Sequence, residues 1–182
     1  MSRRPILAGA AALSLALVPA LALGAARPGP VQPLTGGAAL RSAGASALAL
    51  VSYRVAPLGY SIRFAPGRQG VRANTDTGAH RITIFMRKGD VPSLVAHDIA
   101  HEMGHAFDAT RMSPGARRAY LRARGVPKAA WFPGRTASDY SAGAGDFAEV
   151  FALCHAPSAV FRSRLAPRPA NPCGLLPAAA LR

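Results

Sequence analysis

The segment His101-Glu102-Met103-Gly104-His105 has the residue types and spacing that most directly predict chemistry. Residues four apart in a helix lie on one face, one turn above each other, so His101 and His105 can share a tetrahedral zinc ion. Glu102 points to the side of this pair, where its carboxylate can take a proton from metal-bound water. We therefore predict Zn²⁺ as cofactor and Glu102 as general base. The alternative is a pair of solvated or core histidines without an ion.

The few acidic residues support a metal site, because only eight Asp and Glu occur in the whole chain. Three of them, Asp98, Glu102 and Asp108, fall in the predicted helix of the motif. Two more, Asp146 and Glu149, fall in a later predicted helix. We expect this later helix to supply an acidic third ligand.

Two other residues of the motif helix need an interpretation. Asp108 is a candidate acceptor for an imidazole N–H, and an ordinary helix-surface position is the alternative. His97 lies one turn before His101, but three ligands on one helix would span too far for one ion. We therefore expect His97 to be a pocket wall or a surface residue.

The segments HEMGHAFD (101–108) and SDYSAGAGDFAEVFA (138–152) resemble the two signature segments of gluzincin-like zinc metallopeptidases. The similarity is nearest to the lethal-factor-like peptidases and more distant to the Mlc titration factor group. It covers about residues 80–155 and implies a zincin fold that hydrolyses peptide bonds. The metzincin pattern is excluded, because Asp108 and Arg111 hold the places of its glycine and third histidine.

Gly145 departs from the family pattern, because many relatives have glutamate at this position. The third ligand is then expected to be Asp146 or Glu149. The spacing from Tyr140 favours Asp146, as does the usual order of a ligand followed by a histidine-orienting acid. Helical angle favours Glu149, because Asp146 lies about 100° from the face of position 145. A further alternative is an Asp146–Glu149 capping box. We favour Asp146, with Glu149 as its partner.

The resemblance also implies a substrate site. Tyr140 takes the place of the family's tyrosine near the scissile carbonyl, where its hydroxyl would donate to the oxyanion; simple packing is the alternative. The predicted strand 80–87 precedes the motif helix, where zincins hold the substrate backbone by strand addition. Trp131 and Phe132 are expected to line the cleft or to join the core.

Hydrophobic periodicity predicts the elements that position these residues. Strands are expected at 47–55, 60–65 and 80–87, and helices at 92–109, 115–124 and 146–155, with a loop over 126–145. In the last strand Ile82, Ile84 and Met86 alternate with polar or outward residues, and Asp90 is the expected N-cap of the first helix. Strands followed by helices predict a small α+β domain with a short antiparallel or mixed sheet.

The N-terminus predicts export. Residues 1–26 contain Arg3 and Arg4, an apolar run from Pro5 to Leu23 and three small residues, the order of a secretory signal. A membrane anchor is the alternative. The segment SRRPIL (2–7) resembles a bacterial twin-arginine export signal. We expect a secreted or extracytoplasmic protein with a flexible leader over 27–46 and one zincin-like domain over 47–182.

Two further features concern stability and partners. Cys154 and Cys173 are the only cysteines, and export predicts a disulfide between them, with free thiols or a metal site as alternatives. The formal charge of +14 would attract anionic wall polymers without a dedicated site. No basic run has interleaved aromatic residues, so we predict no specific nucleic-acid partner.

The sequence leaves three functions open. The leading one is a monomeric, secreted zinc peptidase acting on peptide or protein substrates. The first alternative is an inactive zincin scaffold with a binding or regulatory role, which the loss of glutamate at Gly145 keeps open. The second is a basic extracellular module that binds anionic polymers and holds zinc for structure only.

Overall fold

The structure is a computed structural model that describes residues 34–35, 37–135, 137–156 and 158–182. The predicted signal segment 1–26 lies outside the described residues. The predicted leader is in part regular structure, since Leu34–Thr35 form strand β1 and Ala38–Leu48 form helix α1. Helix α1 is held by packing of small residues: a Cβ at Gly44 would overlap the ring of Phe64 on the sheet. An Ala, Gly and Ser composition thus forms a docked helix where a flexible segment was expected.

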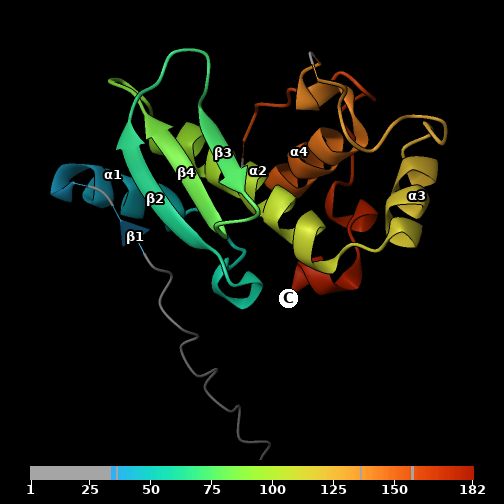
Figure 1. The fold of residues 1–182 in the computed structure, drawn as a ribbon, viewed down its shortest axis with the longest axis horizontal. Helices are drawn as coiled ribbons and strands as arrows, with labels where there is room; N and C mark the ends of the chain where they lie inside the picture. The colour runs from blue at the N-terminus through green and yellow to red at the C-terminus, as the bar shows by residue number, and fades with distance from the viewer. Residues whose placement is uncertain (1–33, 36, 136, 157) are drawn as a thin grey trace, which may run out of the picture.

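One mixed sheet has the strand order β1-β2-β4-β3, with β2 at Ser61–Pro66, β3 at Ala73–Asp76 and β4 at Arg81–Met86 (Figure 1). Strands β1, β2 and β4 are parallel, and β3 pairs antiparallel with β4. Strand β4 is therefore internal, and β3 is an edge. Ile82 and Ile84 are buried as predicted, whereas Met86, the third residue of the predicted alternation, is only half-buried.

The predicted strand at 47–55 is wrong. Ala47 and Leu48 complete α1, and the chain then reaches a 3₁₀ turn, η1, at Ala56–Leu58. Alanine is the best helix former, and this part of the chain is rich in it. Gly59 follows with a φ of 76°, a left-handed conformation that suits glycine and turns the chain into β2.

Three further helices follow the sheet: α2 at Pro92–Arg111, α3 at Pro114–Ala123 and α4 at Gly143–His155. Asp90 is not the cap of α2, whose N-cap is Val91 without a side-chain hydrogen bond. The Asp90 carboxylate instead accepts from the backbone N–H of Arg87 at 2.7 Å and from Arg72 at 3.0 Å. Helix α4 begins before Asp146, with Ala142 at its N-cap, so Asp146 and Glu149 do not form a capping box.

Helix α2 lies between the sheet and α4 (Figure 1). Gly104, inside the histidine motif, permits this packing, since a Cβ there would lie 2.8 Å from the Cα of Ala148. The aromatic residues Tyr53, Phe107, Phe147 and Phe151 pack around the same helix pair. The molecule is thus a small α+β fold in which the motif helix is fixed on both sides.

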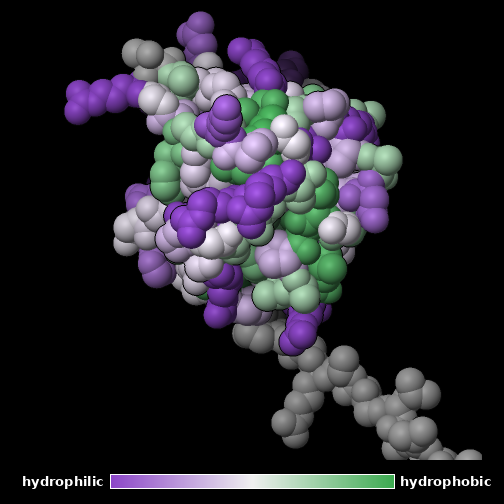
Figure 2. Space-filling model, turned by 90° about the vertical axis from the view of Figure 1, so that its right-hand side faces the viewer, coloured by the Kyte–Doolittle hydropathy of each residue, from purple (hydrophilic) through white to green (hydrophobic). Residues whose placement is uncertain are grey.

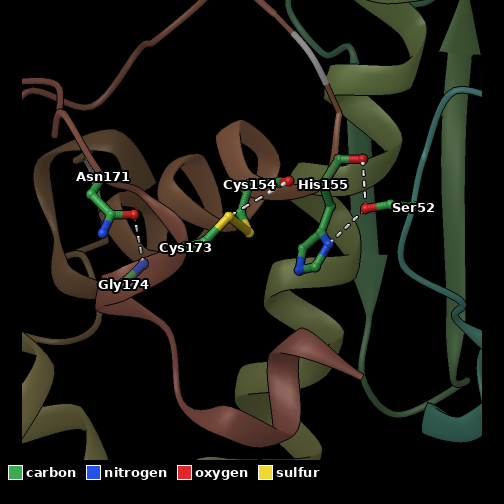
Figure 3. The surroundings of a disulfide bond; sticks show 6 residues. All are labelled: Ser52, Cys154, His155, Asn171, Cys173 and Gly174. Carbon is green, nitrogen blue, oxygen red and sulfur yellow. Dashed lines mark hydrogen bonds between the residues drawn. A yellow bond between two sulfur atoms is a disulfide. The ribbon is translucent and has the colours of Figure 1, made fainter.

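The predicted disulfide is confirmed: Cys154 on α4 and Cys173 at the start of turn η3 (Cys173–Leu175) are bonded (Figure 3). Next to it, the hydroxyl of Ser52 lies 3.0 Å from Nδ1 of His155. A last 3₁₀ turn, η4, covers Ala178–Leu181. In the described part of the chain, no helix has both the length and the apolar character that crossing a membrane requires.

Candidate metal centre

His101 and His105 meet on one face of α2, as the motif predicts. Their Nε2 atoms lie 3.1 Å apart, with His101 buried and His105 partly exposed. At this distance the two nitrogens cannot both carry a proton on the side where they meet. They can share either one proton in a hydrogen bond or one metal cation.

Asp139 completes this group, because its Oδ2 atom lies 3.3 Å from Nε2 of His101 and 3.2 Å from Nε2 of His105. In the described part of the chain these three residues form the one cluster with metal-ligand spacing. A tetrahedral zinc ion with bonds of about 2.0–2.1 Å holds its ligand atoms about 3.3 Å apart. The three residues thus match the donor types and the spacing of a zinc site with one position open.

Asp139 is held by its local structure. It opens the 3₁₀ turn η2 (Asp139–Ser141), and its Oδ1 atom accepts the backbone N–H of Tyr140 at 2.8 Å. Gly145 lets this turn lie against α4, since a Cβ there would overlap the carbonyl group of Asp139. The backbone of Asp139 therefore needs the space that Gly145 leaves by having no side chain.

Glu149 lies behind the histidines. Its Oε1 atom is 2.8 Å from Nδ1 of His101 and 3.1 Å from Nε2 of His97, and its Oε2 accepts the backbone N–H of Arg162 at 2.5 Å. A carboxylate there accepts the N–H of Nδ1 of His101, so Nε2 is the nitrogen that faces His105 and Asp139. His97 is fully buried, so it is neither a pocket wall nor a surface residue as expected.

Asp146 points to the other side of α4, toward α3. Its carboxylate accepts from Nε of Arg124 at 2.7 Å, from the hydroxyl of Tyr120 at 2.7 Å and from Ser163 at 2.6 Å. It is fully buried, and its oxygens already have partners. The residue favoured from the sequence as third ligand thus lies in an ion pair away from the histidines, and Asp139 is the acid that lies beside them.

The histidines and carboxylates of the cluster strongly change one another's pKa. Burial would lower the pKa of His101, but its contacts with Asp139 and Glu149 outweigh burial and raise that pKa to about 10. Burial works in the opposite sense on the two carboxyl groups, yet the histidines hold the pKa of Asp139 and of Glu149 well below the usual range. His101 therefore carries a proton between two ionised carboxylates in the metal-free protein, and a bound metal cation can take the place of that proton.

Glu102 and Tyr140 lie beside the cluster. The hydroxyl of Thr75, on the edge strand β3, lies 2.7 Å from Oε2 of Glu102 and 3.0 Å from its carbonyl oxygen. The Tyr140 ring centroid is 5.4 Å from that of His101. Burial raises the pKa of Tyr140 to about 12, against a lowering by Arg162, so its hydroxyl keeps its proton at neutral pH.

A groove of about 840 Å³ passes over these residues. Its walls come from β3, α2 and the segment before α4, and include Thr75, Glu102, Asp139 and Tyr140. The strand beside the groove is β3, because β4, the strand proposed from the sequence to hold substrate, is paired on both sides. An edge strand keeps free backbone groups for an extended peptide.

The other candidates divide between groove and interior. Asp108 accepts from Nε of Arg117 at 2.7 Å and from Nε1 of Trp131 at 2.9 Å, and no imidazole bond to Asp108 appears in the described part of the chain. Trp131 packs on Tyr120 and Phe147 at the edge of the core. Phe132 lines the groove and is 60% exposed.

Sequence reasoning missed Asp139. The only available signal was its position between Ser138 and Tyr140, where a serine cap and an acidic residue favour a tight turn. A comparison of the chain with protein-family models, curated proteins and solved structures finds no match.

Proposed function

We propose that this protein is a zincin-type zinc peptidase in which His101, His105 and Asp139 hold the metal. The observation that carries the proposal is the triangle of their three ligand atoms, with sides of 3.1 to 3.3 Å. Glu149 supports it by fixing the ring of His101. Asp139 also supports it, because it places a carboxylate beside the histidines although Gly145 lacks the glutamate that the resembled families have.

Zinc bound by these residues would make a water molecule acidic and polarise a carbonyl group. Glu102 would take the proton of that water and later give it to the leaving amine. Thr75 positions the Glu102 carboxylate by its hydrogen bond of 2.7 Å. Tyr140 keeps its proton and can donate it in a hydrogen bond to the carbonyl oxygen as negative charge develops. Strand β3 would align the substrate backbone.

The place of action in this proposal is outside the cytoplasm, because the first residues have the order of a secretory signal. The Cys154–Cys173 disulfide fits an oxidising compartment.

The decisive experiment is the Glu102→Gln variant. Glutamine keeps the size and the hydrogen bond from Thr75 but accepts no proton, so we expect full zinc content and peptidase activity lower by several orders of magnitude. Zinc is measured by atomic emission on purified protein, and activity on a pool of synthetic peptides. A wild-type protein without stoichiometric zinc, or a variant with wild-type turnover, would contradict the proposal.

A second candidate, a basic module that binds anionic polymers, rests on the distribution of charge. Five of the eight acidic side chains are buried: Asp98, Glu102, Asp108, Asp146 and Glu149. Lys and Arg therefore greatly outnumber exposed acidic residues on the outer surface of the described part of the chain, and a band of hydrophilic side chains crosses the face in Figure 2. Retention on a polyphosphate column that persists in metal-free protein and falls steeply with salt would support this role.

A further inference from the structure

One end of the groove is built on a buried carboxylate shared by two arginines. Asp98, one turn before the histidine motif on α2, accepts from Nε of Arg72 at 2.6 Å and from Nη1 of Arg162 at 2.8 Å. Arg72 also contacts Asp90 at 3.0 Å. The two guanidinium groups are thus fixed in place before any ligand binds.

A molecule in the groove would meet the arginines rather than Asp98. All three side chains line the groove, but those of Arg72 and Arg162 are 25% and 24% exposed, whereas that of Asp98 beneath them is only 3% exposed. Arg162 also reaches the candidate catalytic centre, because it lies close enough to Tyr140 to act on its pKa. Guanidinium groups held in a fixed orientation bind carboxylates well, often through two hydrogen bonds.

The opposite end of the groove differs, although it contains a similar ion pair. Arg117 contacts the buried Asp108 at 2.7 Å. Its guanidinium, however, lies 5.6 Å from the ring centroid of Trp131 and 5.2 Å from that of Phe132. Aromatic rings therefore flank this cation, and the exposed Phe132 offers an apolar surface beside it.

The edge strand relates these two ends to the direction of a bound peptide. Antiparallel pairing is the more stable form, and a peptide antiparallel to β3 would run from the Asp76 end toward the Ala73 end. Arg72 directly precedes β3, and Thr75, near the other end, contacts Glu102. The part of the peptide beyond the Glu102 position, on its C-terminal side, would thus lie at Arg72 and Arg162.

We propose that Arg72 and Arg162 form a subsite for a carboxylate on the C-terminal side of the scissile bond. The substrate class is then a peptide with an acidic side chain there, or one that ends there in a free carboxylate. The position of the scissile bond rests on the proposed function, but the affinity of the groove for a carboxylate does not.

The binding arm of the test uses the Glu102→Gln protein and fluorescent peptides in matched pairs. One pair differs by Glu or Gln at an internal position, and the other by a C-terminal carboxylate or carboxamide. We expect the acidic member of at least one pair to bind about 10- to 100-fold more tightly, as for a hydrogen bond between charged groups. Preference in the first pair identifies a side chain as the source, and preference in the second identifies a chain end.

When Arg162→Gln is added to the Glu102→Gln protein, the affinities for the acidic and the amide member of each peptide pair should become nearly equal. Arg162→Lys in its place should keep part of the preference for the acidic member. Arg117→Gln is the matched control at the other end and should leave this preference unchanged. Thermal unfolding of each variant checks the fold, and Arg72→Gln replaces Arg162→Gln if the latter does not fold. Equal affinity within both pairs, or a preference lowered as much by Arg117→Gln, would overturn the subsite.

The cleavage arm separates this proposal from the proposed function. Digestion of the synthetic peptide pool by wild-type protein should give cuts followed within two residues by Asp, Glu or the chain end. Cuts without that bias contradict the subsite but do not contradict the proposed peptidase function. Absence of any cut contradicts the peptidase, and the binding arm then decides the subsite alone.

Discussion

Asp146 and Glu149 lie less than one turn apart on α4 and are both fully buried, yet they have opposite surroundings. Asp146 faces Arg124, a permanent cation whose side chain is only 5% exposed. Glu149 faces His97 and His101, which carry charge only when protonated. The first carboxylate is paired with a permanent charge within the fold, whereas the second is paired with histidines, whose proton a metal ion can replace. Burial of an acid therefore does not reveal its role; the kind of partner does.

The largest effect on stability is expected from Asp146→Ala. The change leaves Arg124 and the hydroxyl of Tyr120 buried without their partner, which typically costs about 3–5 kcal/mol of unfolding free energy. Urea unfolding of the zinc-free protein measures it. The folded fraction should still bind zinc with wild-type affinity. A loss of zinc affinity without a loss of stability would make Asp146 a ligand after all.

Asp139→Ala should have the opposite effects, with little change in stability and a large loss of zinc affinity. Asp139 is 36% exposed and contacts the two histidines rather than a permanent cation, so its loss should change stability little. Zinc affinity should fall by more than about 100-fold, because loss of a ligand exceeds the effect of losing a residue behind it. Competition with a zinc chelator measures the affinity, and Asp76→Ala is a control at a similarly exposed acid. Unchanged affinity would remove Asp139 from the site.

The contrast depends on Asp139, a residue that local sequence patterns did not reveal, whereas Asp146 was identified from the sequence and assigned the wrong partner. The periodicity of β4 and the helical spacing of the motif in α2 are local, and the structure contains both. Asp139 reaches the histidines only because the turn η2 lies on α4 over Gly145, a contact between separate elements. The helical structure of α1 also depends on a contact between separate elements, because its small residues pack against Phe64 on the sheet. Such contacts leave no periodic trace in the sequence.

Glu149→Gln should give a smaller effect on zinc. Glutamine keeps the shape but replaces one of the two acceptor oxygens by an N–H₂ group. Either His97 and His101, which share Oε1, or the backbone N–H of Arg162, which uses Oε2, then loses its acceptor. Zinc affinity should fall by about 10- to 100-fold, the usual range for a residue that orients a ligand. Asp146→Asn is the matched control on the same helix. An effect of Asp146→Asn on zinc as large as that of Glu149→Gln would erase the contrast between the two acids.

The smallest predicted effect is the release of a proton when zinc binds. The pKa of His101 lies near 10, above its ordinary value, so at pH 7 the metal-free protein holds a proton that zinc must displace. Apparent zinc affinity should therefore rise up to tenfold per pH unit between pH 7 and about 9 from this group. Calorimetry in two buffers with different ionisation enthalpies measures the proton. An identical heat in both buffers would show that no proton is released.

The disulfide has a consequence beyond stabilisation. The loop that it closes, from Cys154 to Cys173, contains Arg162, whose backbone holds Glu149 and whose side chain holds Asp98. It also contains Ser163, which contacts Asp146. The oxidation state of two distant sulfur atoms thus sets how much freedom this wall of the groove has, because an open loop samples many more conformations. A reduced chain would contain every residue of the site but would hold this wall loosely. The site would then become fully ordered only after the disulfide has formed in an oxidising compartment.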